Sequence, residues 1–351
     1  MNNEQLIDKL NREKSLQKGE WISLISSCSA DDFEYAKNLA QKIAVENFGK
    51  TIYFRGIIEY TNYCKNDCLY CGIRRSNKGL SRYRLLLDEI MECCADGYRG
   101  GFRTFVLQGG EDLYFNDDRM VEIIKAIKQK FPDCAVTLSI GEKEKESYER
   151  FFKAGADRYL LRHETADNEH YKKLHPKEMS LEHRLNCLKE LKNIGFQTGC
   201  GFMVGTPFQT PESLADDMMY ITEFQPQMVG IGPFISHKDT PFRDKQSGDA
   251  AKTLFLLSLT RILLPNVLLP ATTALGTARG DGRQLGVLCG CNVIMPNLSP
   301  MSVRKKYMLY DNKAGTSDTA QTGIEKLRAQ MDEIGYSVTV GRGDFKEKNY
   351  D

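Results

Sequence analysis

From residue 51 onward, short apolar runs alternate with longer amphipathic segments, and this alternation limits the possible folds more than any other feature. The apolar runs are rich in Val, Ile and aromatic residues, which is typical of strands. Eight strands are predicted, at 52–60, 104–108, 135–139, 158–161, 197–202, 228–231, 267–271 and 292–295. The segments between them, such as 117–130, 181–194, 211–223 and 251–264, show helical periodicity. The pattern predicts an α/β fold, a closed (β/α)8 barrel of the TIM type, with a doubly wound open sheet as the alternative.

Additions to this barrel are expected at both ends of the chain. Helical periodicity at 3–16 and 31–48 precedes the first strand and predicts an N-terminal helical extension at 1–50. No low-complexity linker divides the rest, so the barrel is expected to span 51–311 as one domain. Residues 312–351 are expected to form a C-terminal helix and a tail packed on the barrel.

The charge balance is close to even, with 48 Lys and Arg against 47 Asp and Glu. Nucleic-acid binders usually carry a basic excess or a basic stripe, so nucleic acid is not an expected partner. Residues 1–20 are polar and mixed in charge, unlike a secretory signal. The most apolar stretch, 254–271, contains Arg261 and Pro265, so no association with a membrane is expected. These features predict a cytoplasmic protein.

Cys64, Cys68 and Cys71 form a C-x3-C-x2-C motif directly after the first predicted strand. Three thiolates this close in sequence can converge on one soft metal centre. Four thiolates normally complete a 4Fe–4S cluster, so three leave one iron open to the amine and carboxylate of an amino acid. A zinc knuckle is the alternative, although no nearby His or Cys completes a tetrahedral set. The remaining eight of the eleven cysteines are scattered, as is common for buried thiols.

Polar residues follow several of the predicted strands. In a closed barrel these strand ends converge on one mouth, where active sites lie. Taken singly, a Gly-Gly pair also fits a tight turn, and a Thr pair also fits local hydrogen bonding. The residues at these ends are Gln108, Gly109, Gly110 and Glu111, then Ser139, Arg162 and Glu164, and finally Thr272 and Thr273.

The cysteine motif, with Tyr70 just before its last cysteine, resembles that of the radical S-adenosylmethionine (SAM) superfamily. The resemblance implies that the three cysteines hold one 4Fe–4S cluster, which binds SAM and passes one electron to its sulfonium. The product is a 5'-deoxyadenosyl radical. The resemblance also implies a set of cofactor contacts: Tyr70, the Gln108-Gly109-Gly110-Glu111 segment at the methionyl amino group, Ser139 near the ribose, Glu164 and Arg184 as polar contacts, and Met203, Met228 and Ile231 around the adenine.

Longer motifs make the resemblance more specific. The segment 64–84, together with V-L-Q-G-G-E-D, D-R-Y-L-L-R-H-E-T, M-V-G-I-G-P-F-I, P-A-T-T-A-L-G-T and C-N-V-I-M-P-N, is similar to the FeFe-hydrogenase maturase family HydE, in order from about 51 to 310. This similarity implies a small anionic iron–cyanide–carbonyl substrate supplied by a HydG-type maturase. It also implies assembly of the di-iron subcluster on a HydF-type maturase, and a low-potential electron donor such as ferredoxin or flavodoxin.

The same resemblance implies substrate contacts at the mouth. Arg162, Thr272 and Thr273 match positions that bind anions or substrate, and Tyr307 and Tyr310 match residues that close the cavity. A guanidinium opposite two hydroxyls suits an anionic ligand.

Two departures from related families refine the prediction. Some HydE proteins carry extra cysteines near the C-terminal end of the barrel for a second cluster, but 311–322 contains none here, so a single cluster is expected. Biotin synthase uses strand cysteines for a sulfur-donating cluster, where this chain has Val106, Ala135 and Gly199, so sulfur insertion is disfavoured. A methylornithine-synthase-like mutase, a biotin-synthase-like enzyme and a non-catalytic cluster scaffold are the alternatives.

Overall fold

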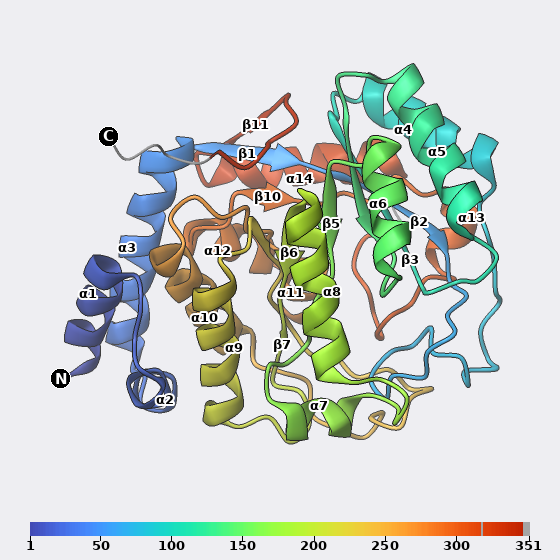
Figure 1. Ribbon diagram of the computed structural model, residues 1–351. Coiled ribbons are helices and arrows are strands. Elements are labelled where there is room, and N and C mark those ends of the chain that lie inside the picture. Colours follow the sequence, from blue (N-terminus) through green and yellow to red (C-terminus); the bar gives the residue numbers. More distant parts are fainter. Residues whose placement is uncertain (317–318, 347–351) are drawn as a thin grey trace.

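The strands of the protein lie at its centre and helices cover them (Figure 1). A computed structural model describes residues 1–316 and 319–346; the last five residues of the expected C-terminal tail lie outside the described residues. Six parallel strands form the main sheet, in the order β2-β3-β4-β5-β6-β8. They are β2 (Gly56–Thr61), β3 (Thr104–Gly109), β4 (Ala135–Ser139), β5 (Arg158–Leu160), β6 (Gln197–Cys200) and β8 (Met228–Val229).

Backbone hydrogen bonds close this sheet into a barrel. They run from β8 to the predicted seventh strand at 267–271, from there to β10 (Val293–Ile294), and from the end of β10 back to β2. The bonds are Val229 N–H to Leu268 O at 3.1 Å, Ala271 N–H to Val293 O at 2.9 Å and Ile57 N–H to Pro296 O at 2.9 Å. The predicted TIM-type fold is confirmed, although 267–271 pairs only through isolated bridges.

Two of the predicted strands are interrupted in the structure. The first predicted strand is divided at Arg55 into β1 (Thr51–Phe54) and β2, and β1 pairs with β10 and with β11 (Ser337–Thr339), a strand not predicted from the sequence. The fifth predicted strand, at 197–202, ends as β6 at Cys200 because Gly201, at φ +150°, turns beside Gly230; a Cβ at Gly201 would lie 2.1 Å from Gly230 O. The chain then forms β7 (Met203–Val204), which pairs with β9 (Gly232–Pro233).

Helices begin and end where local residues satisfy their free backbone groups. Ser180 Oγ accepts from His183 N–H at the start of α8, and Gly195 ends it at φ +108°. None of the described helices has both the length and the apolar composition needed to cross a membrane. The barrel helices are α4 (Leu87–Arg99), α5 (Asp117–Lys130), α6 (Lys145–Lys153), α7 (Asn168–Leu174), α8 (Leu181–Ile194), α9 (Pro211–Phe224), α10 (Ala250–Leu263), α11 (Thr273–Ala278), α12 (Gly282–Leu288), α13 (Met301–Arg304) and α14 (Ala320–Glu333).

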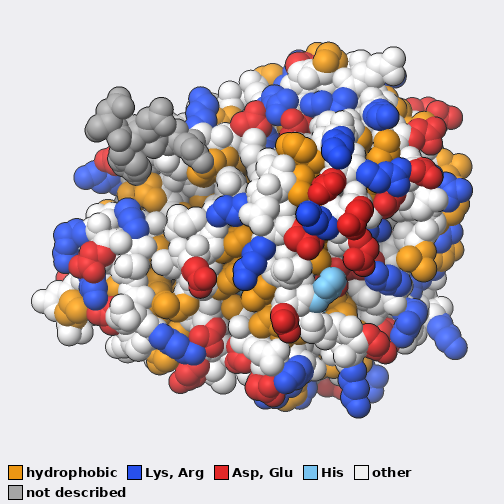
Figure 2. All heavy atoms as spheres, viewed as in Figure 1, with side chains coloured by type: hydrophobic (Ala, Val, Ile, Leu, Met, Phe, Trp, Pro, Cys, Tyr) orange, Lys and Arg blue, Asp and Glu red, His pale blue; other side chains and the backbone are white. Residues whose placement is uncertain are grey.

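Three helices precede the barrel and pack on one side of it (Figure 1). They are α1 (Asn3–Glu13), α2 (Lys18–Ser26), which was not predicted, and α3 (Ala30–Phe48). The α3 helix contacts α10, and the α2 helix contacts α9. Trp21, on α2, is fully buried. On the face in Figure 2, Lys and Arg side chains are interspersed with Asp and Glu, in keeping with the even charge balance.

The C-terminal tail closes the floor of the barrel, at the end opposite the mouth. Arg158 on β5 is fully buried and donates to Thr104 Oγ1 at 3.0 Å and to the backbone oxygen of Arg342 at 2.8 Å. It also forms an ion pair with Asp344. Arg55 donates to the backbone oxygen of Gly343 at 3.2 Å. The tail therefore supplies the acceptors that two buried guanidinium groups require.

Replacing Asp344 with alanine is expected to lower the free energy of unfolding by about 3 kcal/mol, because it leaves Arg158 buried without its counter-ion. The exposed Asp281, paired with Arg279, is a matched control, and D281A should change stability by less than about 1 kcal/mol. Urea unfolding of the two variants measures the difference. Equal stability of D344A and the parent would contradict this role of the tail.

The same contact has a pH dependence. Burial opposes ionisation of Asp344, but hydrogen bonding to Arg342 and the charge of Arg158 outweigh it and lower the pKa of the carboxyl to about 2. Because this pKa lies below the unfolded value of 3.8, the stabilisation is fully present above that value and is lost as the pH falls towards 2.

Candidate active site

The three motif cysteines lie on a loop that leaves the C-terminal end of β2, and each is half-buried. Backbone hydrogen bonds tie this loop to parts of the chain that are distant in sequence. Lys65 N–H donates to Glu111 O and Leu69 N–H to Leu174 O, both at 2.9 Å, and Gly72 N–H donates to Leu309 O at 2.8 Å. The loop is therefore held in place by three other segments of the barrel mouth.

Burial dominates the chemistry of these thiols. It raises the pKa of Cys68 well above its ordinary value, and the neighbouring Cys71 and Cys64 raise it further. Burial and Cys64 likewise raise the pKa of Cys71 to about 12. Iron must therefore displace protons from these sulfurs when it binds.

Within residues 1–316 and 319–346, no three His, Cys, Asp or Glu side chains are arranged to hold a single metal ion.

The Gly109-Gly110 pair lies directly against the cysteine loop. A Cβ at Gly110 would lie 2.2 Å from Tyr63 O and 2.7 Å from Cys64 Cβ, so the loop can approach only a glycine here. Next to the pair, the Glu111 carboxylate is buried, accepts from Glu142 N–H at 3.0 Å and pairs with Lys65 Nζ at 3.1 Å. The structure thus brings the cysteine motif and the Gly-Gly-Glu segment into one site, as a cluster with an amino-acid ligand requires.

Polar side chains form a layer across neighbouring strands at this end of the barrel. Glu59, Gln108 and Ser139 stand in register on β2, β3 and β4. The Gln108 side chain is hydrogen-bonded to the hydroxyl of Tyr307, which is buried on the loop that crosses the mouth. The predicted residues Gln108, Ser139 and Tyr307 therefore lie at the same end of the lumen as the cysteine loop.

Glu164 has a strained backbone, with φ +67°, in the region that non-glycine residues rarely adopt. Its N–H donates to Gly201 O at 3.0 Å, and Met203 N–H donates to Glu164 O at 3.3 Å. The adjacent His163 is fully buried between Asp217 Oδ1 at 3.1 Å and Gly201 N–H at 3.3 Å. These contacts hold a conformation that costs about 1–3 kcal/mol, as is common at functional sites.

Burial, together with the nearby charges of two arginines, lowers the pKa of His163 to about 3, so the imidazole is neutral. It therefore acts as a fixed hydrogen-bonding anchor for the turn that carries Glu164.

Arg162 and Glu164 form an ion pair, with Nη2 and Oε2 2.9 Å apart. The structure therefore brings together two residues that the sequence assigns to different ligands, one to substrate and one to SAM. Within the described chain, the buried Nε of Arg162 has no hydrogen-bond partner. An unsatisfied buried donor costs about 1–3 kcal/mol, so this guanidinium is arranged to receive a further acceptor.

Arg184 lies behind this pair. It is buried on α8, donates from Nε to Glu142 Oε1 at 2.6 Å and from Nη1 to the backbone oxygen of Arg162 at 3.1 Å. Its charge reaches Cys68 and Tyr70, where it opposes the effect of burial on both pKa values. Arg184 thus positions the turn of Arg162 and Glu164, and two of its donors are already used within the protein.

The three residues predicted around the adenine occupy different places. Met203 packs with Tyr70 in a small apolar cluster beside the cysteine loop. Ile231 lies in the main hydrophobic core. Met228 is the first residue of β8 and its sulfur accepts from Arg55 Nη1 at 3.1 Å, at the floor of the barrel. Of the three, the structure brings only Met203 to the cysteine loop.

The threonine pair begins a helix rather than ending a strand. Thr272 is the N-cap of α11, and its Oγ1 accepts from Leu275 N–H at 3.3 Å. Thr273 is the first residue of this helix and lines a cavity beside the lumen. Tyr310 is close enough to Arg162 for their charges to interact and is hydrogen-bonded to Thr277. The pair and Tyr310 therefore lie on the side of the mouth formed by α11.

Three further residues contact the site and were not predicted from the sequence. His175 Nε2 lies 3.2 Å from Tyr70 Oη, and the His175 ring stacks on Tyr171 with centroids 3.8 Å apart. Met179 Sδ lies 3.9 Å from Cys68 Sγ. Glu142 links Arg184 to the Glu111 segment. Only Glu142 could have been found from the sequence, because it follows β4 at the mouth.

The comparisons with known proteins agree with this geometry. The sequence profile of the radical SAM superfamily matches residues 58–221. The FeFe-hydrogenase maturase subunit HydE of Thermotoga maritima is 46% identical to this chain over 314 residues, which cover 89% of each protein. The chain belongs to the HydE family of radical SAM enzymes. The barrel fold is that of its relatives, and the cofactors of this HydE-family enzyme are a 4Fe–4S cluster and SAM.

More distant relatives share the whole barrel with this HydE-family chain. The 3-methylornithine synthase of Methanosarcina barkeri is 28% identical over 313 residues, which cover 88% of this chain and 87% of that protein. The crystal structure of a methylornithine synthase superimposes with a TM-score of 0.84 at 25% identity, over 95% of this chain and 97% of that one.

Proposed function

We propose that this HydE-family enzyme acts in maturation of FeFe-hydrogenase, on an anionic iron–cyanide–carbonyl complex that becomes part of the di-iron subcluster. The observation that carries the proposal is the 46% identity to a hydrogenase maturase subunit along 89% of the chain. When bound, the cluster and SAM supply a 5'-deoxyadenosyl radical. The protein's own residues hold the cofactor and the substrate on opposite parts of the same mouth.

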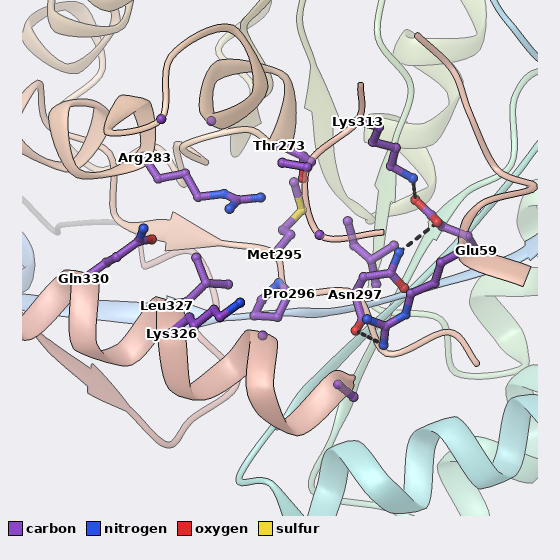
Figure 3. Close-up of a pocket in the computed structure, with 18 residues that line it drawn as sticks. Glu59, Thr273, Arg283, Met295, Pro296, Asn297, Lys313, Lys326, Leu327 and Gln330 are labelled. Carbon is purple, nitrogen blue, oxygen red and sulfur yellow. Dashed lines mark hydrogen bonds and ion pairs between the residues drawn. The ribbon is translucent and has the colours of Figure 1, made fainter. Parts of the chain in front are cut away.

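The mouth offers donors suited to such a substrate. Arg162 carries an unsatisfied Nε, and its guanidinium pairs with Glu164 through Nη2. Thr273 lines a cavity beside the lumen (Figure 3), and Tyr310 is hydrogen-bonded to Thr277 on the same helix, α11. Cyanide nitrogens and carbonyl oxygens can accept from these groups, and none of them competes with the substrate's own ligands for iron. We assign Arg162, Thr272, Thr273, Tyr307 and Tyr310 to the substrate.

The cofactor is assigned to the opposite part of the same mouth. Cys64, Cys68 and Cys71 hold the cluster, and Gly109, Gly110 and Glu111 lie against their loop, where the amino acid part of SAM must bind. Tyr70, Met203 and Ser139 extend this surface, while the strained Glu164 presents its carboxylate between cofactor and substrate. Arg184 acts through Arg162 and Glu142 rather than by contact.

Replacing Glu164 with glutamine is expected to weaken binding of SAM about tenfold, since a charge-assisted contact to the cofactor becomes a neutral one. Arg184→Ala should weaken binding less, and should lower stability because it leaves Glu142 without its partner. Glu149→Gln, on the outer face of α6, is the matched control. Equilibrium binding of SAM to reconstituted protein, with the cluster absorbance unchanged, measures these effects. Unchanged affinity in both E164Q and R184A would contradict the placement.

Reconstituted maturation of hydrogenase, with and without this chain, tests the proposed function. The assay includes HydG-type and HydF-type maturases and a low-potential donor such as ferredoxin or flavodoxin. Active hydrogenase should form only when the chain is present. The structural likeness to methylornithine synthase favours a mutase as the second candidate. Formation of 3-methylornithine, without any effect on hydrogenase, would replace the first function with the second.

A further inference from the structure

Positive charge is concentrated at the loop that carries the cysteine motif. Residues 65–84 contain six Lys and Arg residues and one carboxylate, Asp67, although the whole chain is balanced at 48 to 47. The segment follows β2 and lies at the lower right of Figure 1, away from the N-terminal helices. The excess of cations is therefore a local feature of this loop.

Three of these cations are engaged within the protein. Arg74 pairs with Asp67, with Nη2 and Oδ2 2.9 Å apart, and Arg84 pairs with Asp112, with Nε and Oδ2 2.7 Å apart. Arg82 donates to four backbone oxygens, three of them within 73–77. These contacts fix the fold of the segment and use the one carboxylate that it contains.

The other three cations are exposed. The Lys65 side chain follows the first motif cysteine and is 48% exposed, although its Nζ pairs with Glu111. Arg75 N–H donates to Asn66 O at 2.9 Å, which places Arg75 against the stretch between the first two motif cysteines. Arg75 and Lys78 are both exposed, and neither side chain has a hydrogen bond or ion pair with a residue in the described parts of the chain. Their charges are thus available to a partner.

An apolar side chain is exposed beside these cations. Leu113 is 76% exposed, on the loop between β3 and α5. It lies two residues after Glu111, whose backbone oxygen accepts from Lys65 N–H at 2.9 Å. Apolar contacts surrounded by polar residues are the usual composition of protein interfaces. We call Lys65, Arg75, Lys78 and Leu113 the cysteine-loop surface.

Reductive cleavage of SAM requires one electron from outside the protein. A reduced donor gives up this electron and the oxidised cluster accepts it, so no bond forms or breaks and no proton moves in this step. The cysteines assigned to the cluster lie on the loop that carries the exposed cations, so a protein donor comes closest to the cluster by contacting this loop. Contacts of electron carriers are small, below about 1,200 Å², and charge complementarity guides their formation.

We propose that the cysteine-loop surface is the docking site of an acidic electron-carrier protein of the ferredoxin type, whose carboxylates meet Lys65, Arg75 and Lys78. The proposal rests on the proposed function for the position of the cluster, but it does not depend on the identity of the substrate. Attraction between exposed charges is screened by salt, over about 10 Å at 0.1 M ionic strength. Binding of the donor should therefore weaken steeply as salt is added.

Binding of an acidic ferredoxin to the reconstituted holoenzyme tests the surface. The double variant Arg75→Glu, Lys78→Glu reverses two charges without removing a side-chain hydrogen bond, so it should fold as the parent does. Its affinity, measured by anaerobic titration calorimetry at low salt, should fall at least about tenfold. Arg12→Glu with Lys42→Glu is the matched control, because both residues are exposed on the N-terminal helices. Parental affinity in R75E/K78E would overturn the proposal.

Cleavage of SAM separates docking from chemistry. With dithionite, a small reductant that needs no docking surface, R75E/K78E should form 5'-deoxyadenosine at the parental rate. With limiting reduced ferredoxin, the rate should fall about tenfold, in line with the lost affinity. An equal loss with both reductants would refute the proposal, because the two residues would then affect the cluster or SAM and not the donor.

Two single variants test the extent of the surface. Asp239 is exposed at its edge, where Oδ2 would lie 3.8 Å from a Cβ added at Gly79, the residue after Lys78. Asp239→Asn removes a charge that repels an acidic donor, so it should strengthen ferredoxin binding about twofold. Leu113→Ser should weaken binding without changing its salt dependence. Parental affinity in both D239N and L113S would contradict the position of the donor.

A maturase is the other occupant that the assays distinguish. If R75E/K78E matured hydrogenase slowly even with dithionite as the reductant, the surface would hold a maturase and the proposal would be wrong. Failure of the proposed function has a different result. Ferredoxin would still bind at the cysteine-loop surface and drive cleavage of SAM, while the chain had no effect on hydrogenase maturation.

Discussion

Cys68→Ala is expected to abolish reductive cleavage of SAM, because it removes one of three protein ligands of the cluster. Burial raises the pKa of Cys68, and Met179 Sδ lies 3.9 Å from its sulfur. An alanine there provides no sulfur for the iron that Cys68 would hold, so the cluster loses one of its three protein ligands. Formation of 5'-deoxyadenosine from SAM under strong reductant measures the loss.

Cys93→Ala provides the matched control. Cys93 is buried on α4, so its replacement tests the effect of losing a buried thiol, about 1 kcal/mol of stability, without touching the cluster loop. Cleavage should be retained. The reconstituted parent should contain about four irons per chain, as one 4Fe–4S cluster requires. Eight irons, or cleavage by C68A, would show that the cysteine loop is not the sole cluster site.

The architecture could be predicted because strand and helix periodicity is local. Eight apolar runs separated by amphipathic helices specify the strand order, and closure follows once each strand pairs with the next. The division of the first strand at Arg55 could not be predicted in this way. It depends on the pairing of β1 with β11, two strands that lie near opposite ends of the sequence. It also depends on the C-terminal tail, whose backbone oxygens accept from Arg55 and Arg158.

Within the site, the structure brings the predicted residues on tight loops together, whereas some of those on regular elements lie elsewhere. The cysteine spacing and Gly109-Gly110 carry their own geometric requirement, and the structure places them in contact. Met228 illustrates the opposite case. Met228 is the first residue of β8, so it lies at the floor of the barrel, where its sulfur accepts from Arg55. The position of a residue along its strand decides which end of the barrel it reaches. The start of α11 at Thr272 could not be predicted either, because a threonine pair fits both the end of a strand and the N-cap of a helix.

Arg162→Ala is expected to stop hydrogenase maturation while uncoupled cleavage of SAM remains measurable. Arg162 carries a buried Nε without a hydrogen-bond partner, so its removal eliminates the principal donor proposed for an anionic substrate. It also leaves the half-buried Glu164 without its counter-ion, which should weaken SAM binding as well. Maturation and 5'-deoxyadenosine formation are therefore measured on the same preparation, at saturating SAM.

Arg162→Lys separates these two effects. A lysine keeps the positive charge beside Glu164 but lacks the planar set of donors, so SAM binding should recover while maturation does not. Thr273→Val tests the other side of the cavity, because it removes a hydroxyl with little change of shape. Thr272→Val is less informative alone, since Thr272 Oγ1 caps α11 and its loss costs about 1 kcal/mol of stability. The double variant should then add little to the loss of maturation seen in T273V. Parental maturation rates in both R162A and T273V would refute the assignment, since no donor at this mouth would then be needed to hold the substrate.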